Sequence, residues 1–170
     1  MDFLDRFFII NLLFHQVVAV LGAGAATFTE IFYLKAIRDG KIEEYEAEDL
    51  GVFYFVMRFA LIILVFTGFN ILVVWRLKFL GPDFFYNSRL WAKYMIVLVI
   101  LVNAILIHGK KIPLWLGSPL SLTSWWVVFF LGYWRNANVS FIGIIFGYVL
   151  ALIVVGLILE FIKRKISKIR

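Results

Sequence analysis

The residues of this sequence that could do chemistry are ionisable and amide side chains inside long apolar segments. Such side chains are costly in lipid, and they therefore tend to face a partner, a cavity or a cofactor. Three apolar segments hold almost all of them: Asn11, His15, Gln16 and Glu30 in the first, Arg58 and Asn70 in the second, and Lys93, Asn103 and His108 in the third. We therefore expect any active centre to lie among the first three segments.

Equal spacing relates two pairs of these residues. His15 and Glu30 are fifteen residues apart, as are Lys93 and His108. In an α-helix each pair would lie within about 60° on one face and about 22 Å apart along the axis. The first and third helices of a bundle run in the same direction, so we expect them to stand side by side and to form two layers. His15 and Lys93 make the outer layer; Glu30 and His108 make the inner one, where Arg58 adds a partner for Glu30.

The chemistry that fits this arrangement is haem ligation by one histidine. His15 lies well inside its segment and His108 at the far end of another, so the two imidazoles cannot hold one haem between them. Ligation by His15 with Lys93 or another weak ligand opposite stays open. So do plainer roles: Lys93 snorkelling to the outer interface and His108 hydrated at the inner one. The face between His15 and Glu30 has small residues, which favour helix packing over a binding surface for a porphyrin. These residues are Ala19, Gly22, Ala26 and Thr29.

The amino-acid composition indicates whether these residues belong to a soluble or a membrane protein. The chain has 170 residues, of which 64% are hydrophobic and 16% charged. A soluble domain of this size could not bury so much apolar side chain. Nineteen Phe, seven Tyr and six Trp indicate lipid-facing surface with aromatic belts at its borders. Cysteine is absent, which excludes disulfides, zinc ribbons, iron–sulfur clusters and thiol nucleophiles.

Five uncharged runs are long enough to cross a membrane as helices. They predict an all-α, polytopic bundle of five transmembrane helices that forms a single domain over residues 1–170. A barrel is not expected, because no run alternates between apolar and polar residues. The opening MDFLDR is a poor signal-peptide start, so we expect the first span to be retained. The expected spans are Phe7–Ile31, Val52–Trp75, Leu90–His108, Pro119–Trp134 and Phe141–Ile162.

The fourth span is predicted to be short. With Ser118 as N-cap and Pro119 as the first helical residue, the helix would reach only about 24 Å. The preceding IPLWLGSP would then lie along the inner interface, and Ser121 and Ser124 would serve helix packing. The acidic stretch from Asp39 to Asp49 has no metal-loop spacing and is interpreted as a solvated turn.

Lysine and arginine are distributed unevenly between the two ends of the predicted bundle. One end has Arg6, Arg76, Lys78, Arg89 and Arg135, and the other has Lys35, Arg38, Lys41, Lys110, Lys111, Lys163, Arg164, Lys165, Lys168 and Arg170. The positive-inside rule places the second set in the cytoplasm, so the N-terminus is outside, the C-terminus inside and the protein in the cell (inner) membrane. The basic run Lys163–Arg170 predicts an anchor on anionic lipid rather than a nucleic-acid site.

Two segments resemble a known family. LFHQVVAVLGAGAATF and RLWAKYMIVLVILVNAILIH are similar to the small membrane protoporphyrinogen oxidases and, more loosely, to the copper-resistance D-type membrane proteins. The likeness covers about a third of the chain, and GAGAATFTEIFYLKAI departs from the glycine-aromatic and arginine pattern of those oxidases. The resemblance implies haem b bound through His15 and Lys93. It further implies a redox step on a tetrapyrrole or electron transfer to a membrane quinone, with Glu30, Arg58 and His108 handling protons at the inner face.

The sequence thus favours a haem-associated membrane redox protein, which as an enzyme would be an oxidoreductase. Two alternatives stay open: a non-catalytic membrane scaffold or subunit, and a small ion- or proton-coupled transporter. A second copy of the chain is a further candidate partner. No hydrolase triad, phosphate loop or HExxH metal site is present, so the sequence does not support a hydrolase or a nucleotide enzyme.

Overall fold

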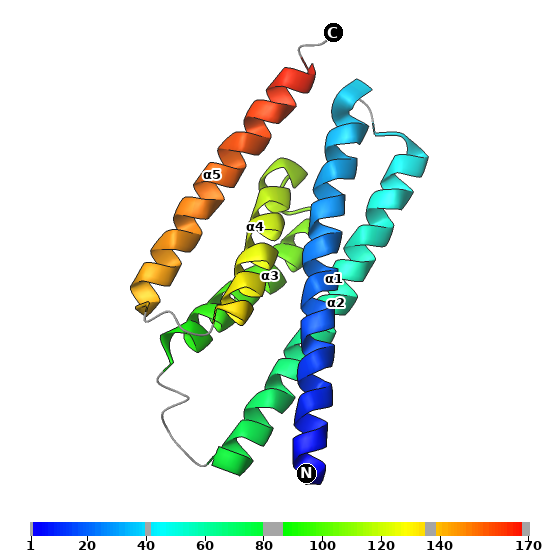
Figure 1. The fold of residues 1–170 in the computed structure, drawn as a ribbon. Helices are drawn as coiled ribbons and strands as arrows, with labels where there is room; N and C mark the ends of the chain where they lie inside the picture. The colour runs from blue at the N-terminus through cyan, green and yellow to red at the C-terminus, as the bar shows by residue number, and fades with distance from the viewer. Residues whose placement is uncertain (1, 40–41, 80–86, 135–138, 168–170) are drawn as a thin grey trace.

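The computed structural model describes residues 2–39, 42–79, 87–134 and 139–167, which form a bundle of long helices (Figure 1). The helices are α1 (Phe3–Ala36), α2 (Glu44–Phe79), α3 (Ser88–His108), α4 (Leu114–Tyr133) and α5 (Phe141–Ser167); the short 3-10 helix η1 (Ile37–Asp39) follows α1. All five α-helices are long and apolar enough to cross a membrane, and the described residues contain no strand. The predicted all-α bundle of five membrane-spanning helices is confirmed.

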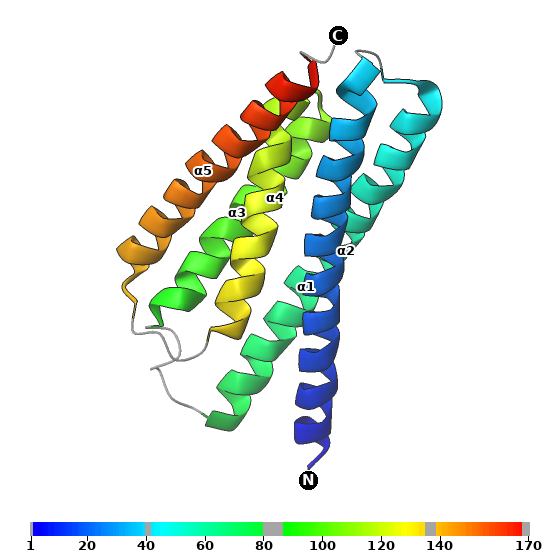
Figure 2. The same ribbon diagram turned by 45° about the horizontal axis from the view of Figure 1, so that its top comes forward.

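The helices do not pack in the predicted order. α1 packs along α2 on one side and against α4 on the other, and α4 also packs against α3 and α5 (Figure 2). The prediction that the first and third helices stand side by side is wrong, because α4 rather than α3 occupies the small-residue face of α1. The N-terminal end of α1 and the C-terminal end of α5 lie at opposite ends of the bundle.

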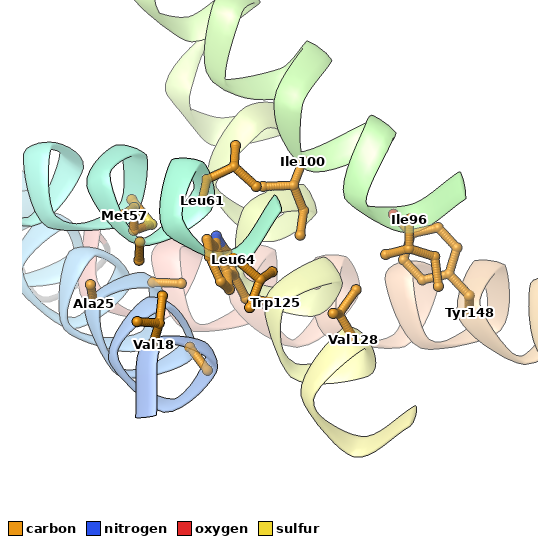
Figure 3. Close-up of a cluster of buried hydrophobic side chains, with 13 residues drawn as sticks. Val18, Ala25, Met57, Leu61, Leu64, Ile96, Ile100, Trp125, Val128 and Tyr148 are labelled. Atoms are coloured by element: carbon orange, nitrogen blue, oxygen red, sulfur yellow. The ribbon is translucent and has the colours of Figure 1, made fainter. Parts of the chain in front are cut away.

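Close approach of α1 and α4 depends on Gly22. The ring of Trp125, which is only 2% exposed, lies so close to Gly22 that a Cβ at this position would collide with it. Around this contact the core gathers side chains from all five helices, among them Val18, Leu64 and Ile100 (Figure 3). The small-residue face of α1 is therefore a packing surface, as the spacing predicts.

The start of α4 corrects the sequence prediction. α4 begins at Leu114, with Pro113 as N-cap, so Ser118 is not a cap and Pro119 lies inside the helix. The carbonyl of Pro113 accepts the first backbone hydrogen bonds, from the N–H groups of Leu116 and Gly117, both at 3.1 Å. A proline this early in a helix removes one hydrogen bond without ending the helix. At 20 residues α4 is about 30 Å long, which is long enough to cross a membrane, and residues 114–119 of IPLWLGSP belong to this helix.

The acidic stretch is also more helical than predicted. α2 begins at Glu44, so the part from Glu44 to Asp49 belongs to the helix rather than to a turn. Carboxylates are favourable in a first turn because they face the unpaired backbone N–H groups. The side chain of Glu46 accepts a hydrogen bond from the backbone N–H of Glu43 at 3.1 Å.

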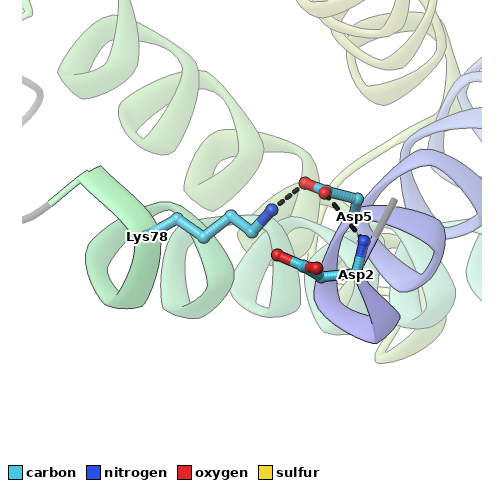
Figure 4. Close-up of polar contacts among 3 residues, drawn as sticks. All are labelled: Asp2, Asp5 and Lys78. Atoms are coloured by element: carbon cyan, nitrogen blue, oxygen red, sulfur yellow. Dashed lines mark hydrogen bonds and ion pairs between the residues drawn. The ribbon is translucent and has the colours of Figure 1, made fainter.

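An ion pair joins α1 and α2 at the other end of the bundle. The Lys78 ammonium contacts the Asp5 carboxylate, which also accepts a hydrogen bond from the backbone N–H of Asp2 at 3.2 Å (Figure 4). Asp5 and Lys78 are partly exposed, so the pair contributes little stability.

Candidate functional site

The imidazole of His15 faces α2. Its Nδ1 lies 2.8 Å from the hydroxyl oxygen of Thr67. The ring also lies beside Gly68, where a Cβ would be 3.4 Å from Cε1 of His15, an ordinary van der Waals contact. One turn before the histidine, Asn11 donates from Nδ2 to the Thr67 carbonyl at 2.9 Å. Two residues of α1 thus hold one residue of α2, and the ring is fixed against the helix rather than directed at lipid.

The hydrogen bonds around Thr67 favour one tautomer of the His15 ring, with the proton on Nδ1. The Thr67 hydroxyl donates to the Ile63 carbonyl at 2.7 Å. A hydroxyl has a single proton to donate, so toward His15 the Thr67 oxygen acts as acceptor and Nδ1 is the donor. In this tautomer Nε2 of the neutral ring keeps its lone pair. This is the form in which histidine binds a metal or accepts a proton.

Lys93 lies on α3, which does not pack along α1. The side chain of Lys93 is half-buried, and no hydrogen bond of the described residues joins it to His15. Among the residues that the structure describes, no carboxylate lies within ion-pair distance of Lys93. The predicted association of His15 with Lys93 stays a prediction, and the lysine has a positive charge available for a ligand.

A second polar site surrounds the carboxylate of Glu30, which is 3% exposed. The Ser118 hydroxyl donates to Oε2, and the Lys163 ammonium lies 3.5 Å from Oε1. The same ammonium lies over the ring of Tyr33, 4.9 Å from its centroid. We call these four residues the Glu30 cluster. It joins α1, α4 and α5 at the end of the bundle where α5 finishes.

The partners of Glu30 differ from those predicted. Arg58 and His108 are exposed, and no hydrogen bond or ion pair of the described residues joins either of them to the carboxylate. Lys163 takes the place expected for Arg58. Sequence reasoning assigned Lys163 to the basic tail, because it directly follows an apolar run. Its position as the first residue of that tail, next to the span, is the signal that could have indicated a buried role.

The two polar sites are separated by apolar packing. His15 and Glu30 lie about 22 Å apart along α1. Gly22 lies midway between them, and the ring of Trp125 packs on it. Ala19, Gly22 and Ala26 on this face have no polar side chain, and the Thr29 hydroxyl donates to the Ala25 carbonyl of its own helix at 2.8 Å, so each site must be considered separately.

Asn103, Ser121 and Ser124 form hydrogen bonds between helices. Asn103 donates from Nδ2 to the Gly117 carbonyl and to the Ser121 hydroxyl oxygen, both at 2.8 Å, which joins α3 to α4. The Ser124 hydroxyl donates to the Leu120 carbonyl at 2.6 Å and lies 2.7 Å from the Tyr148 hydroxyl of α5. The packing role expected of Ser121 and Ser124 is confirmed.

Comparisons with known proteins add no relative to this picture. No family model, curated protein or solved structure matches the chain. Within the described ranges, no group of three or more His, Cys, Asp or Glu side chains could hold a metal ion. The donor at His15 is thus a single imidazole. A porphyrin, which supplies four nitrogens itself, needs no more from a protein than axial ligands.

Proposed function

We propose that this chain is an integral membrane redox protein that holds haem b, with His15 as an axial ligand through Nε2. The observation that carries the proposal is the 2.8 Å contact between Nδ1 of His15 and the Thr67 hydroxyl oxygen, whose own proton is directed at the Ile63 carbonyl. With Nδ1–H as the donor to Thr67, the Nε2 lone pair would be directed away from that bond. Histidines that bind metals are characteristically held by such a hydrogen bond at the other ring nitrogen.

The residues around His15 fit a haem ligand. Thr67 fixes the ring's tautomer and orientation, and Asn11 in turn fixes Thr67. A single neutral imidazole suits an iron whose equatorial ligands come from the porphyrin. Lys93, which has no carboxylate partner among the described residues, would balance a porphyrin carboxylate or serve as the opposite ligand.

Haem bound here would supply one-electron chemistry, and the helices would supply its depth, orientation and low dielectric. Two reactions suit such a centre: oxidation of a tetrapyrrole and electron transfer to a membrane quinone. The positive-inside rule puts the N-terminus outside and the Glu30 cluster at the cytoplasmic side of the cell membrane. The apolar packing at Gly22 and Trp125 would separate the redox centre from that cluster.

The test is an absorption spectrum of the detergent-purified protein, oxidised and reduced, after haem has been offered. Wild type and His108→Ala should both have a Soret band that shifts on reduction, since His108 is exposed and makes no contact with Glu30. His15→Ala should lose the band while it elutes as the wild type does on size exclusion. A wild-type protein without Soret absorption would reject the proposal.

A structural subunit is the second candidate, and the Glu30 cluster favours it. A carboxylate neutralised by Lys163 within the bundle needs no ligand and can serve to hold three helices in register. This function predicts that His15→Ala lowers stability or assembly without affecting any haem signal. Proton flux into proteoliposomes that depends on Glu30 would instead favour a carrier.

A further inference from the structure

Arg58 is a charged residue on the outer surface of a membrane-spanning helix. It lies within the predicted span 52–75 of α2, and its side chain is exposed. Among the described residues, no carboxylate lies within ion-pair distance of its guanidinium. A charge that faces hydrocarbon is costly, and such residues characteristically pair with an opposite charge. The surface around Arg58 therefore lacks a partner that carries a carboxylate.

Glu160 of α5 is an exposed carboxylate in the same half of the bundle. The predicted spans contain two carboxylates, and Glu30 is buried, whereas the side chain of Glu160 is 48% exposed. Within its own chain Glu160 accepts a hydrogen bond from Nε of Arg164 at 2.8 Å. A carboxylate has about four lone-pair sites, so Glu160 can accept hydrogen bonds from a second arginine as well.

The depth of Arg58 follows from the aromatic contacts between α1 and α2. The ring of Phe53 packs against the rings of Phe28 and Phe32, with centroid distances of 5.8 and 5.0 Å. Phe53 is therefore level with Glu30, which lies midway between those two residues of α1. Arg58 follows Phe53 by five residues, so it lies about 7.5 Å further into the bundle.

The depth of Glu160 follows from the ion pair between α1 and α5. The Lys163 ammonium lies 3.5 Å from the Glu30 carboxylate, so these two residues are at about the same level. Glu160 precedes Lys163 by three residues, which places it about 4.5 Å further into the bundle. The depths of Arg58 and Glu160 thus differ by about 3 Å, a difference that a long arginine side chain can span.

Equal depth is the condition for a contact between identical membrane proteins. Copies inserted in the same orientation are related by rotation about the membrane normal, which leaves the depth of every residue unchanged. Apolar side chains gain little by leaving lipid for another helix, so polar pairs and close packing decide which membrane surfaces associate. Arg58 and Glu160 have opposite charges, are both exposed and lie at matching depth.

We infer that a second copy of this chain covers these surfaces, with Arg58 of one copy paired to Glu160 of the other. The planar guanidinium suits a carboxylate, to which it can donate two parallel hydrogen bonds. Since each copy supplies both partners, the contact can repeat between identical chains. The ion pairs would remove the unpaired arginine charge from lipid. The inference does not rest on the haem proposal.

Förster resonance energy transfer between donor- and acceptor-labelled full chains in phosphatidylcholine vesicles tests this inference. A cysteine appended to one end of the chain takes the dye, since the sequence has none of its own. Arg58→Gln and Glu160→Gln should each weaken association about tenfold or more, because hydrogen bonds to charged groups contribute strongly. Arg38→Gln, which removes an exposed arginine of η1 outside the spans, should leave association unchanged.

Exchange of the two charges tests the pair itself. Arg58→Glu and Glu160→Arg should each lose self-association, because each variant brings like charges together at the contact. An equimolar mixture of the two variants should associate again, since every charge then meets its opposite on the other chain. The double variant Arg58→Glu/Glu160→Arg should associate with itself for the same reason.

The fold of a single chain should not depend on this contact. With at most one chain per detergent micelle, Glu160→Gln should change the thermal midpoint of unfolding little, because its side chain is exposed. A wild type that stays monomeric in the vesicles, equal association in Arg58→Gln and Arg38→Gln, or no recovery in the mixture would overturn the inference. If a charge-reversed variant does not fold, the comparison of Arg58→Gln with Arg38→Gln decides alone.

Discussion

Replacing Lys163 by methionine would leave the Glu30 carboxylate without any cation in ion-pair distance among the described residues. The side chains of Lys163 and Glu30 are 12% and 4% exposed, so water screens the pair little. Removing one partner of a buried pair costs about 3–5 kcal/mol. We expect Lys163→Met to cost about 3 kcal/mol, the lower limit of that range, since Ser118 still donates to the carboxylate and Glu30 can take up a proton.

The double variant Glu30→Gln/Lys163→Met removes both charges. It should be more stable than Lys163→Met, with a coupling free energy of at least about 1.5 kcal/mol in the mutant cycle. Glu160→Gln is the matched control on α5. Its ion pair with Arg164 is shorter, at 2.8 Å, but the side chains are 48% and 74% exposed, respectively. It should cost at most about 0.5 kcal/mol.

Steric trapping in detergent micelles measures these free energies of unfolding, and the thermal midpoint of unfolding ranks the same variants. If Lys163→Met were no less stable than Glu160→Gln, the Glu30 cluster would not hold α5 to α1. Burial of the Glu30–Lys163 pair would then not increase its contribution to the free energy of unfolding.

Two other substitutions test the packing and the histidine site. Gly22→Val should lower the free energy of unfolding by about 1–3 kcal/mol or more, because the valine side chain would collide with Trp125. Gly24→Ala, whose added methyl group meets open space, should be close to neutral. The thermal midpoints of unfolding in detergent compare the two variants, and equal midpoints would contradict the close approach of α1 and α4. Thr67→Val removes the acceptor for the His15 ring and should weaken haem binding about 10–100-fold in a spectroscopic titration. An unchanged affinity for haem would mean that the hydrogen bond between Thr67 and His15 does not orient the ring.

Hydropathy sufficed to predict the five membrane-spanning helices, because the cost of exposing polar backbone and side chains to lipid is set by local sequence. α3 was predicted to within two residues at its start and at its end. α4 was not, because the prolines at 113 and 119 both suit a helix start, and only the backbone hydrogen bonds to the Pro113 carbonyl distinguish them.

The neighbours of each helix could not be predicted in the same way. Periodicity indicated that His15 and Glu30 share a face of α1, but not which helix covers that face. The bulky Trp125 of α4 fits Gly22, and this fit depends on side-chain shape, to which hydropathy is insensitive. The pairing of Glu30 with Lys163 follows from that packing order and joins residues far apart in the sequence.

The central claim is that Nδ1 of His15 carries the proton and Nε2 is free to bind iron. Nitrogen-15 NMR of the histidine-labelled, haem-free protein in detergent tests it directly, with the exposed His108 as internal reference. At neutral pH the account predicts a neutral His15 ring in the Nδ1–H tautomer, with unprotonated Nε2, and loss of that tautomer in Thr67→Val. A His15 ring protonated at Nε2 would contradict the account, because its remaining lone pair would then face Thr67 rather than a haem.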